Sequence, residues 1–117
     1  MTEPRNALET VERIIQRDGR YKIEAYSFVL AALSYTVRRL KESRHVKGGE
    51  LLQGIKEYAK AQFGPMARTV FEHWGVKSTE DFGHIVFSLV DVKLLGKTEQ
   101  DSIADFKDGY DFKEVFG

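Results

Sequence analysis

The sequence predicts a mainly α-helical fold, specified as a single-domain five-helix bundle with a winged-helix-like C-terminal half and a small antiparallel β-hairpin. Apolar residues recur three and four positions apart in five segments, as on one face of a helix. Glycines or Asp-Gly pairs separate these segments. The 117 residues, 42% apolar and 31% charged, suffice for one hydrophobic core and are too few for two domains of ordinary size. We expect residues 1–117 to form one domain.

The first two predicted helices cover residues 3–17 and 22–43. Thr2, which precedes an acidic residue and a proline, is a typical start for the first helix, and Gly19 follows its end. The second segment contains neither Gly nor Pro and is apolar on most sides, so we expect it at the centre of the bundle. Its main apolar stripe consists of Tyr26, Val29, Leu30, Leu33, Val37 and Leu40.

Two shorter helices are predicted over residues 50–63 and 66–74. The Gly-Gly pair at 48–49 breaks the chain before the third helix. The Gly-Pro pair at 64–65 separates the third helix from the fourth, because glycine suits the left-handed position after one helix and proline suits the first turn of the next.

The fifth predicted helix, residues 79–95, follows a four-residue turn that begins at Gly75. Ser78, with an aspartate three residues later, resembles a capping box at the helix start, and Gly96 is expected to end the helix. An Asp-Gly pair flanked by aromatic residues predicts a hairpin over residues 104–113. Two helices joined by a tight turn and followed by a hairpin have the order of a winged helix.

The charge of the fifth helix argues against DNA reading. Residues 79–95 contain three acidic side chains and one lysine, so that the helix would repel a phosphate backbone. The segment also lacks the Arg, Asn and Gln side chains that commonly contact base edges. We therefore predict that this helix does not read the major groove.

The formal net charge of zero hides a basic and an acidic end. Residues 1–47 carry ten Lys or Arg against six Asp or Glu, whereas residues 98–117 carry two against six. A basic segment before the helix start at 48–49 predicts an anion site, because helix N-termini attract anions and guanidinium groups add charge. The predicted anion-binding residues are Arg38, Arg39, Arg44, His45 and Lys47. The predicted protein-interaction residues are Glu80, Asp81, Asp101, Asp105, Asp108 and Asp111.

Several classes of function lack their usual residues. The absence of cysteine excludes disulfides, thiolate zinc sites and thiol nucleophiles. The three histidines form no H-x-x-x-H pair, and no serine lies in a G-x-S-x-G motif. We predict no catalytic residue, cofactor or metal ligand and favour a protein that is not an enzyme. No signal peptide or membrane anchor is evident, so we expect a cytoplasmic protein.

Four strings carry a family resemblance: DGRYKIEAYSFVLAALSYTVRRL, HVKGGELLQGIKEYAKAQFGPMARTVFEHWGV, DFGHIVFSLVDVKLLGKTEQD and DFKDGYDF. Together they resemble an uncharacterised bacterial family of conserved hypothetical proteins, from about Leu8 to Phe116. This resemblance implies no activity and assigns no site residue.

Two functions remain open at this point. The first is a non-catalytic protein-interaction or regulatory adaptor module that binds another protein through the acidic residues. The alternative is an anion-binding protein for RNA, a nucleotide or another phosphate ligand, with the basic segment as its site. Nucleic acid binding would use that segment without major-groove readout, and the oligomeric state is left open.

Overall fold

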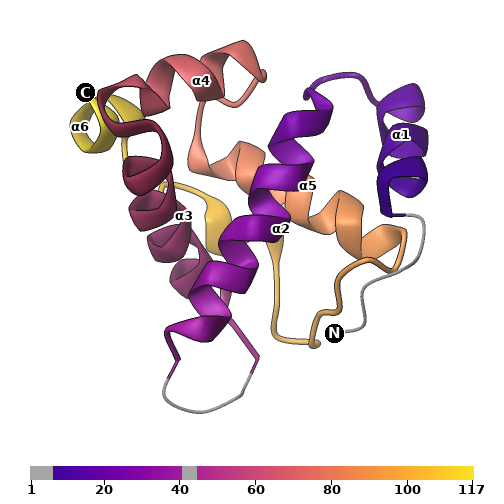
Figure 1. Cartoon of the computed structure of the whole chain (residues 1–117). Coiled ribbons are helices and arrows are strands. Elements are labelled where there is room, and N and C mark those ends of the chain that lie inside the picture. Colours follow the sequence, from indigo (N-terminus) through magenta and orange to yellow (C-terminus); the bar gives the residue numbers. More distant parts are fainter. Residues whose placement is uncertain (1–6, 41–44) are drawn as a thin grey trace.

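The structure is a computed structural model, which describes residues 7–40 and 45–117 (Figure 1). The fold is mainly helical, as predicted, and helices occupy all five predicted segments. The α-helices are α1 (Ala7–Arg17), α2 (Ile23–Arg38), α3 (Gly48–Phe63), α4 (Ala67–His73), α5 (Thr79–Asp91) and α6 (Phe112–Phe116). Two 3₁₀ helices are η1 (Gly64–Met66) and η2 (Ile103–Phe106). None of the helices in the described ranges is long and apolar enough to span a bilayer.

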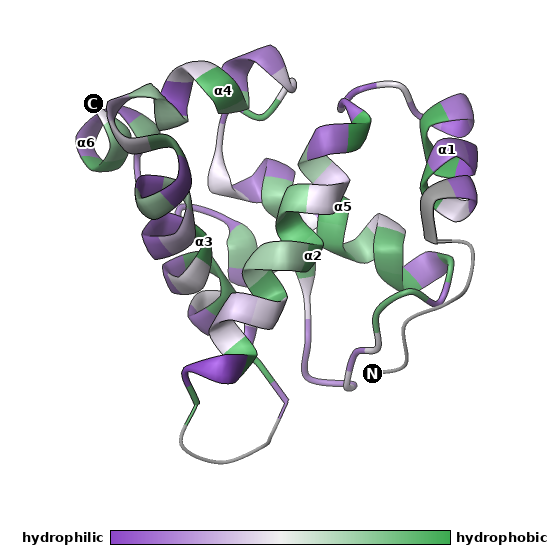
Figure 2. Cartoon of the chain, in the orientation of Figure 1, coloured by the Kyte–Doolittle hydropathy of each residue, from purple (hydrophilic) through white to green (hydrophobic). Residues whose placement is uncertain are grey.

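Helices α2 and α5 form the centre of the molecule. Helix α2 packs against α1, α3 and α5, and α5 also packs against α3 and η2 (Figure 1). Both central helices are hydrophobic along much of their length, whereas α1 and α3 alternate hydrophobic and hydrophilic residues (Figure 2). Within α5 only Asp91 is exposed, and the other residues are buried or half-buried. The helix in the position of a winged-helix recognition helix, which the sequence analysis predicted not to read DNA, is thus a core helix.

Aromatic side chains fill the space between α2, α4 and the C-terminal segment. Phe71 in α4 is fully buried, and its ring contacts the rings of Phe28, Phe82, Phe112 and Phe116 with centroid separations of 5.2–5.7 Å. Each such ring pair contributes about 0.5–1.5 kcal/mol beyond its buried area. The C-terminal segment is therefore an integral part of the core.

The predicted β-hairpin over 104–113 is wrong. The winged-helix-like description of the C-terminal half is therefore not supported, because the hairpin was to be its wing. No strand occurs in the part of the chain that the structure describes. The Thr79 hydroxyl donates to the Phe106 carbonyl (2.6 Å) and accepts from the Gly109 N–H (3.0 Å). Asp111 then caps α6, accepting from the Lys113 N–H at 2.8 Å. A side chain of α5 and a helix cap thus bond backbone groups that a hairpin would have paired across its strands.

Replacing Thr79 by Val is expected to lower the free energy of unfolding by about 2–4 kcal/mol, because the Phe106 carbonyl and the Gly109 N–H lose their partner and the first of these bonds is buried. Thr79 itself is 1% exposed, so water cannot replace the hydroxyl readily. Urea denaturation of Thr79→Val and Thr79→Ser measures the effect. The serine variant keeps the hydroxyl, and an equal loss in both variants would contradict this role for it.

Several predicted boundaries also shift. Helix α3 begins at Gly48, two residues early, because the Glu50 carboxylate accepts from the Lys47 N–H (3.1 Å) and fixes the glycine pair in the first turn. Helix α2 ends at Arg38 instead of 43. Helix α1 is described from Ala7, so the start predicted at residue 3 is not tested. Residues 1–6 and 41–44 lie outside the described ranges.

Helix α5 ends at Asp91 and not at the predicted 95, because Lys93 takes the left-handed conformation (φ 64°). The Leu94 N–H then donates to the Leu89 carbonyl and the Lys93 N–H to the Val90 carbonyl, both at 2.9 Å. This is the Schellman pattern with lysine where glycine is usual, so that Gly96 does not act as the cap.

Replacing Lys93 by Gly is expected to raise the free energy of unfolding by about 0.5–1 kcal/mol, since glycine adopts the left-handed conformation without the steric cost of a Cβ atom. The exposed side chain forms no ion pair within the described residues, so its removal costs little. Thermal unfolding measures the change, and a lower midpoint for Lys93→Gly would contradict the assignment.

Candidate functional site: an apolar cavity with a charged rim

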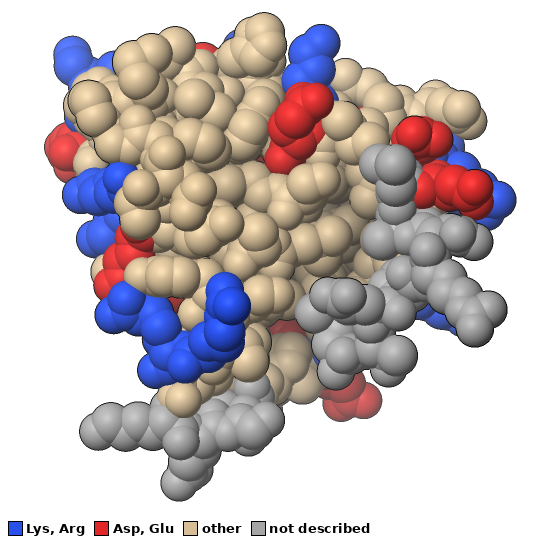
Figure 3. All heavy atoms as spheres, viewed as in Figure 1, with Lys and Arg blue, Asp and Glu red and all other residues tan. Residues whose placement is uncertain are grey.

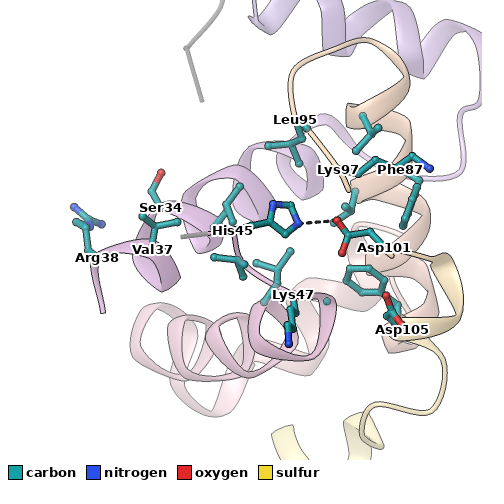
Figure 4. A pocket seen from close by; sticks show the side chains of 18 residues that line it. Ser34, Val37, Arg38, His45, Lys47, Phe87, Leu95, Lys97, Asp101 and Asp105 are labelled. Carbon is teal, nitrogen blue, oxygen red and sulfur yellow. Dashed lines mark hydrogen bonds and ion pairs between the residues drawn. The ribbon is translucent and has the colours of Figure 1, made fainter. Parts of the chain in front are cut away.

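A cavity of about 890 Å³ opens between α2, the start of α3, α5 and η2 (Figure 4). Its volume falls in the range of about 300–1,000 Å³ that small-molecule sites usually have. Apolar side chains from all four elements form its walls, among them Leu33, Val37, Leu51, Val86, Val90 and Phe106. The cavity therefore offers an apolar surface that no single segment of the sequence could supply.

Val37 differs from the other apolar residues of its stripe. The sequence placed it in the core, but its side chain is 41% exposed and lines the cavity. Most of the large hydrophobic side chains in the described ranges are more deeply buried, and Met66 on η1 is the other clear exception. An exposed valine at a concave surface gives that surface apolar character toward solvent.

Three of the predicted anion-binding residues line this cavity, namely Arg38, His45 and Lys47. Arg39 does not: its guanidinium donates to the Tyr35 hydroxyl (2.6 Å) and lies 3.7 Å from a Glu57 carboxylate oxygen. Arg44 lies outside the described residues. Lys and Arg side chains gather on the face in view near the end of α2 and the start of α3 (Figure 3).

His45 and Asp101 form a hydrogen bond between two residues that line the cavity (Figure 4). Nε2 of His45 lies 2.6 Å from Oδ2 of Asp101, and the aspartate side chain is 19% exposed. Burial by itself raises the pKa of this carboxyl, but the Thr98 N–H and the His45 ring outweigh burial and hold the pKa below its ordinary value. Asp101 is therefore ionised at neutral pH and joins the chain after α5 to the chain before α3.

The predicted protein-interaction residues lie in separate places. Asp101 and Asp105 line the apolar cavity, where Asp105 also accepts from the Ser102 N–H at 3.0 Å. Glu80, Asp108 and Asp111 line a second, more polar depression of about 920 Å³ beside α4 and the C-terminal segment. The acidic residues therefore do not form one face.

Asp81 faces neither depression and serves a structural role. One carboxylate oxygen accepts from the backbone N–H groups of Lys77 (2.8 Å) and Ser78 (3.2 Å) at the start of α5. The other accepts from the Tyr21 hydroxyl at 2.5 Å. This carboxylate thus caps α5, as the sequence indicated, and also ties the segment before α2 to the turn after α4.

Lys97 and Phe87 are cavity residues that the sequence analysis did not predict. The Lys97 ammonium lies 5.7 Å from the centre of the Phe87 ring, and both residues line the cavity. In sequence Lys97 is an isolated cation after the last apolar stripe, and only the turn at Lys93 brings it back toward α5. Helical periodicity does not predict that a residue after the end of α5 lies against the side of α5.

The charged residues that line the cavity, called here its rim, are cations without an ion pair and carboxylates that already accept hydrogen bonds. Within the described ranges, Arg38, Lys47 and Lys97 form no ion pair, and each of the three side chains is exposed. Asp101 is bonded to His45, and Asp105 to a backbone N–H. The arrangement provides apolar contact inside and unpaired positive charge at the edge.

Comparisons with known proteins give no further constraint on this site. The family resemblance of the sequence stays a prediction. The chain matches no protein-family model, no curated protein and no solved structure.

Proposed function

We propose that this protein is a non-catalytic binding module that takes up an amphipathic anion in the apolar cavity. The apolar part of such a ligand contacts the walls, and its carboxylate, phosphate or sulfonate group lies beside Arg38, Lys47 or Lys97. One observation carries the proposal. The apolar cavity is also lined by three cations, and none of them pairs with a described carboxylate.

The two kinds of contact contribute unequally to affinity. An aromatic group that buries about 150 Å² of apolar surface gains about 4 kcal/mol at 25 cal/mol per Å². An exposed ion pair contributes only about 0.2–1 kcal/mol. The walls therefore supply most of the affinity, and the rim cations select anionic over neutral ligands.

A nucleic acid chain is a poorer occupant than a small amphipathic anion. Asp101 and Asp105 line the same cavity as the three cations and would repel the successive phosphates of a nucleic acid. The side chains of α2, α3 and α5 that form the walls are mainly aliphatic. Single-stranded nucleic acids, in contrast, usually stack on aromatic rings. Among the predicted anion ligands we therefore propose one with a compact apolar body.

The acidic adaptor surface receives less support from the geometry. Asp81, Asp105 and Asp111 each accept a backbone N–H hydrogen bond at the start of a helix or 3₁₀ helix. Their position in sequence is explained by helix capping. A protein partner that binds through the acidic residues stays a prediction.

Binding of 8-anilinonaphthalene-1-sulfonate, an apolar fluorophore with one anionic group, tests the proposal. We expect saturable fluorescence enhancement with the folded protein and an affinity about tenfold lower for Val37→Glu, which places negative charge on the cavity wall. The matched control is Met66→Glu, because Met66 is also an exposed hydrophobic residue (55%) but lies away from the cavity. Equal affinities for the two variants would contradict the proposal.

The contribution of charge is measured with a neutral analogue of similar shape, N-phenyl-1-naphthylamine. Replacing Lys47 and Lys97 together by Met is expected to weaken sulfonate binding severalfold and to leave binding of the neutral analogue unchanged. Lys60→Met, an exposed lysine of α3 outside the cavity, is the control. A cavity with equal affinity for both fluorophores in every variant would be an apolar site and not an anion site.

A further inference from the structure

A third and smaller depression lies between α2, α3 and α4, apart from the apolar cavity and the polar depression. Its volume is about 350 Å³, near the lower end of the range for ligand sites. The residues on which the argument depends are Glu24, Phe28, Tyr58, Phe63 and Trp74. No residue lines both this depression and the apolar cavity, so the two sites are tested independently.

Aromatic rings dominate this depression. The Phe28 ring is buried and lies 5.4–5.7 Å, between centroids, from the rings of Tyr58, Phe63 and Trp74. The other three side chains are half-buried, so each retains surface accessible to solvent. Half-buried aromatic clusters are the usual anchors of protein interfaces.

The charge around the rings is negative. Among the described residues that line the depression, Glu24 is the only charged one, and it forms no ion pair with another described residue. Much of the surface over α2, α3 and α4 in view carries uncharged residues (Figure 3). A carboxylate beside exposed ring surface is complementary to a flat cation, because ring faces are themselves electronegative.

We propose that this depression binds an arginine side chain of a protein partner. The guanidinium group stacks on the aromatic side chains and donates hydrogen bonds to the Glu24 carboxylate. Arginine fits better than lysine, since its planar group combines stacking with paired donors, whereas an ammonium is compact and strongly hydrated. The surface thus gives this protein a protein-binding site distinct from the acidic residues.

Trp74 is the only tryptophan of the sequence, so its fluorescence reports on this depression directly. The probe is a short alanine peptide with one central arginine and blocked ends, compared with the same peptide carrying glutamine. We expect a saturable change in Trp74 emission with the arginine peptide and at least fivefold weaker binding of the glutamine peptide. Equal responses to the two peptides, or a response that does not saturate, would overturn the proposal.

The affinity of the arginine peptide for Glu24→Gln is the second measurement. Because Glu24 is exposed, this substitution is expected to keep the fold and to weaken arginine-peptide binding about threefold to fivefold. Glu12→Gln, an exposed carboxylate on α1 away from the depression, is the matched control and is expected to change nothing. An unchanged affinity in Glu24→Gln would remove the carboxylate from the site and overturn the proposal.

Discussion

Replacing Gly54 by Ala is expected to lower the free energy of unfolding by about 3 kcal/mol or more, because α2 and α3 touch at this residue. An added Cβ atom would overlap Oγ1 of Thr36 on α2. That hydroxyl is buried and donates to the Ala32 carbonyl at 2.7 Å, so moving it away would break a buried hydrogen bond. The helices must separate, and the apolar contacts between them weaken.

Gly49 is the matched control in the same helix. A Cβ atom there meets no other atom within 4 Å, and alanine favours helix more than glycine does. Gly49→Ala is therefore expected to leave stability unchanged or to raise it by up to about 1 kcal/mol. Urea denaturation of both variants measures the contrast. Equal losses would contradict the close approach of α2 and α3, whereas partial recovery in Thr36→Ala/Gly54→Ala would support it.

Replacing Gly75 by Ala is the second large change, with an expected loss of about 3 kcal/mol and a fall of roughly 10 °C in Tm. Gly75 has φ 88°, which alanine adopts only at a cost, and a Cβ atom would overlap the carbonyl oxygen of Arg20. The segment before α2 is held there, since the Lys22 N–H donates to the Trp74 carbonyl at 3.0 Å.

Gly96 separates the effect of this packed turn from that of glycine replacement in general. It has no positive φ, and a Cβ atom would meet nothing within 4 Å. Gly96→Ala is expected to shift Tm by less than about 2 °C. A comparable fall in both variants, measured by calorimetry, would show that the Gly75 turn is not under the constraint described here.

Local signals in the sequence predicted the start and end of several helices. The predicted turn that begins at Gly75 occurs in the structure, with the Val76 N–H donating to the Phe71 carbonyl at 2.8 Å and the Val76 side chain fully buried. The aspartate at Asp81 caps α5 as expected. Such signals are reliable because the backbone groups they satisfy lie within four residues of the side chain or turn that satisfies them.

The hairpin prediction was wrong because the partners of this segment are distant in sequence. Asp108-Gly109 does form a turn, with φ 50° at Asp108, but the chain on either side bonds to Thr79 and to its own short helices. The partner lies about 30 residues away in sequence. A turn signal alone does not specify which strands or helices it joins.

The candidate site was predictable only in part. The basic segment indicated Arg38, His45 and Lys47, because clustered cations are visible in sequence. The facing Asp101 lies 56 residues from His45, and the apolar walls come from three helices and a 3₁₀ helix. Periodicity places such residues on the inner face of a helix and does not distinguish a filled core from a cavity.

The most direct test of the central claim is chemical-shift mapping of methyl-labelled protein titrated with 8-anilinonaphthalene-1-sulfonate. Binding in the apolar cavity predicts the largest shifts at the methyl groups of Leu33, Val37 and Val90, with small changes at Ile23 beside the aromatic depression. In Val37→Glu, the shifts at the two remaining residues, Leu33 and Val90, are expected to need about tenfold more fluorophore. Shifts confined to methyl groups outside the cavity, or spread evenly over the molecule, would contradict the proposed function.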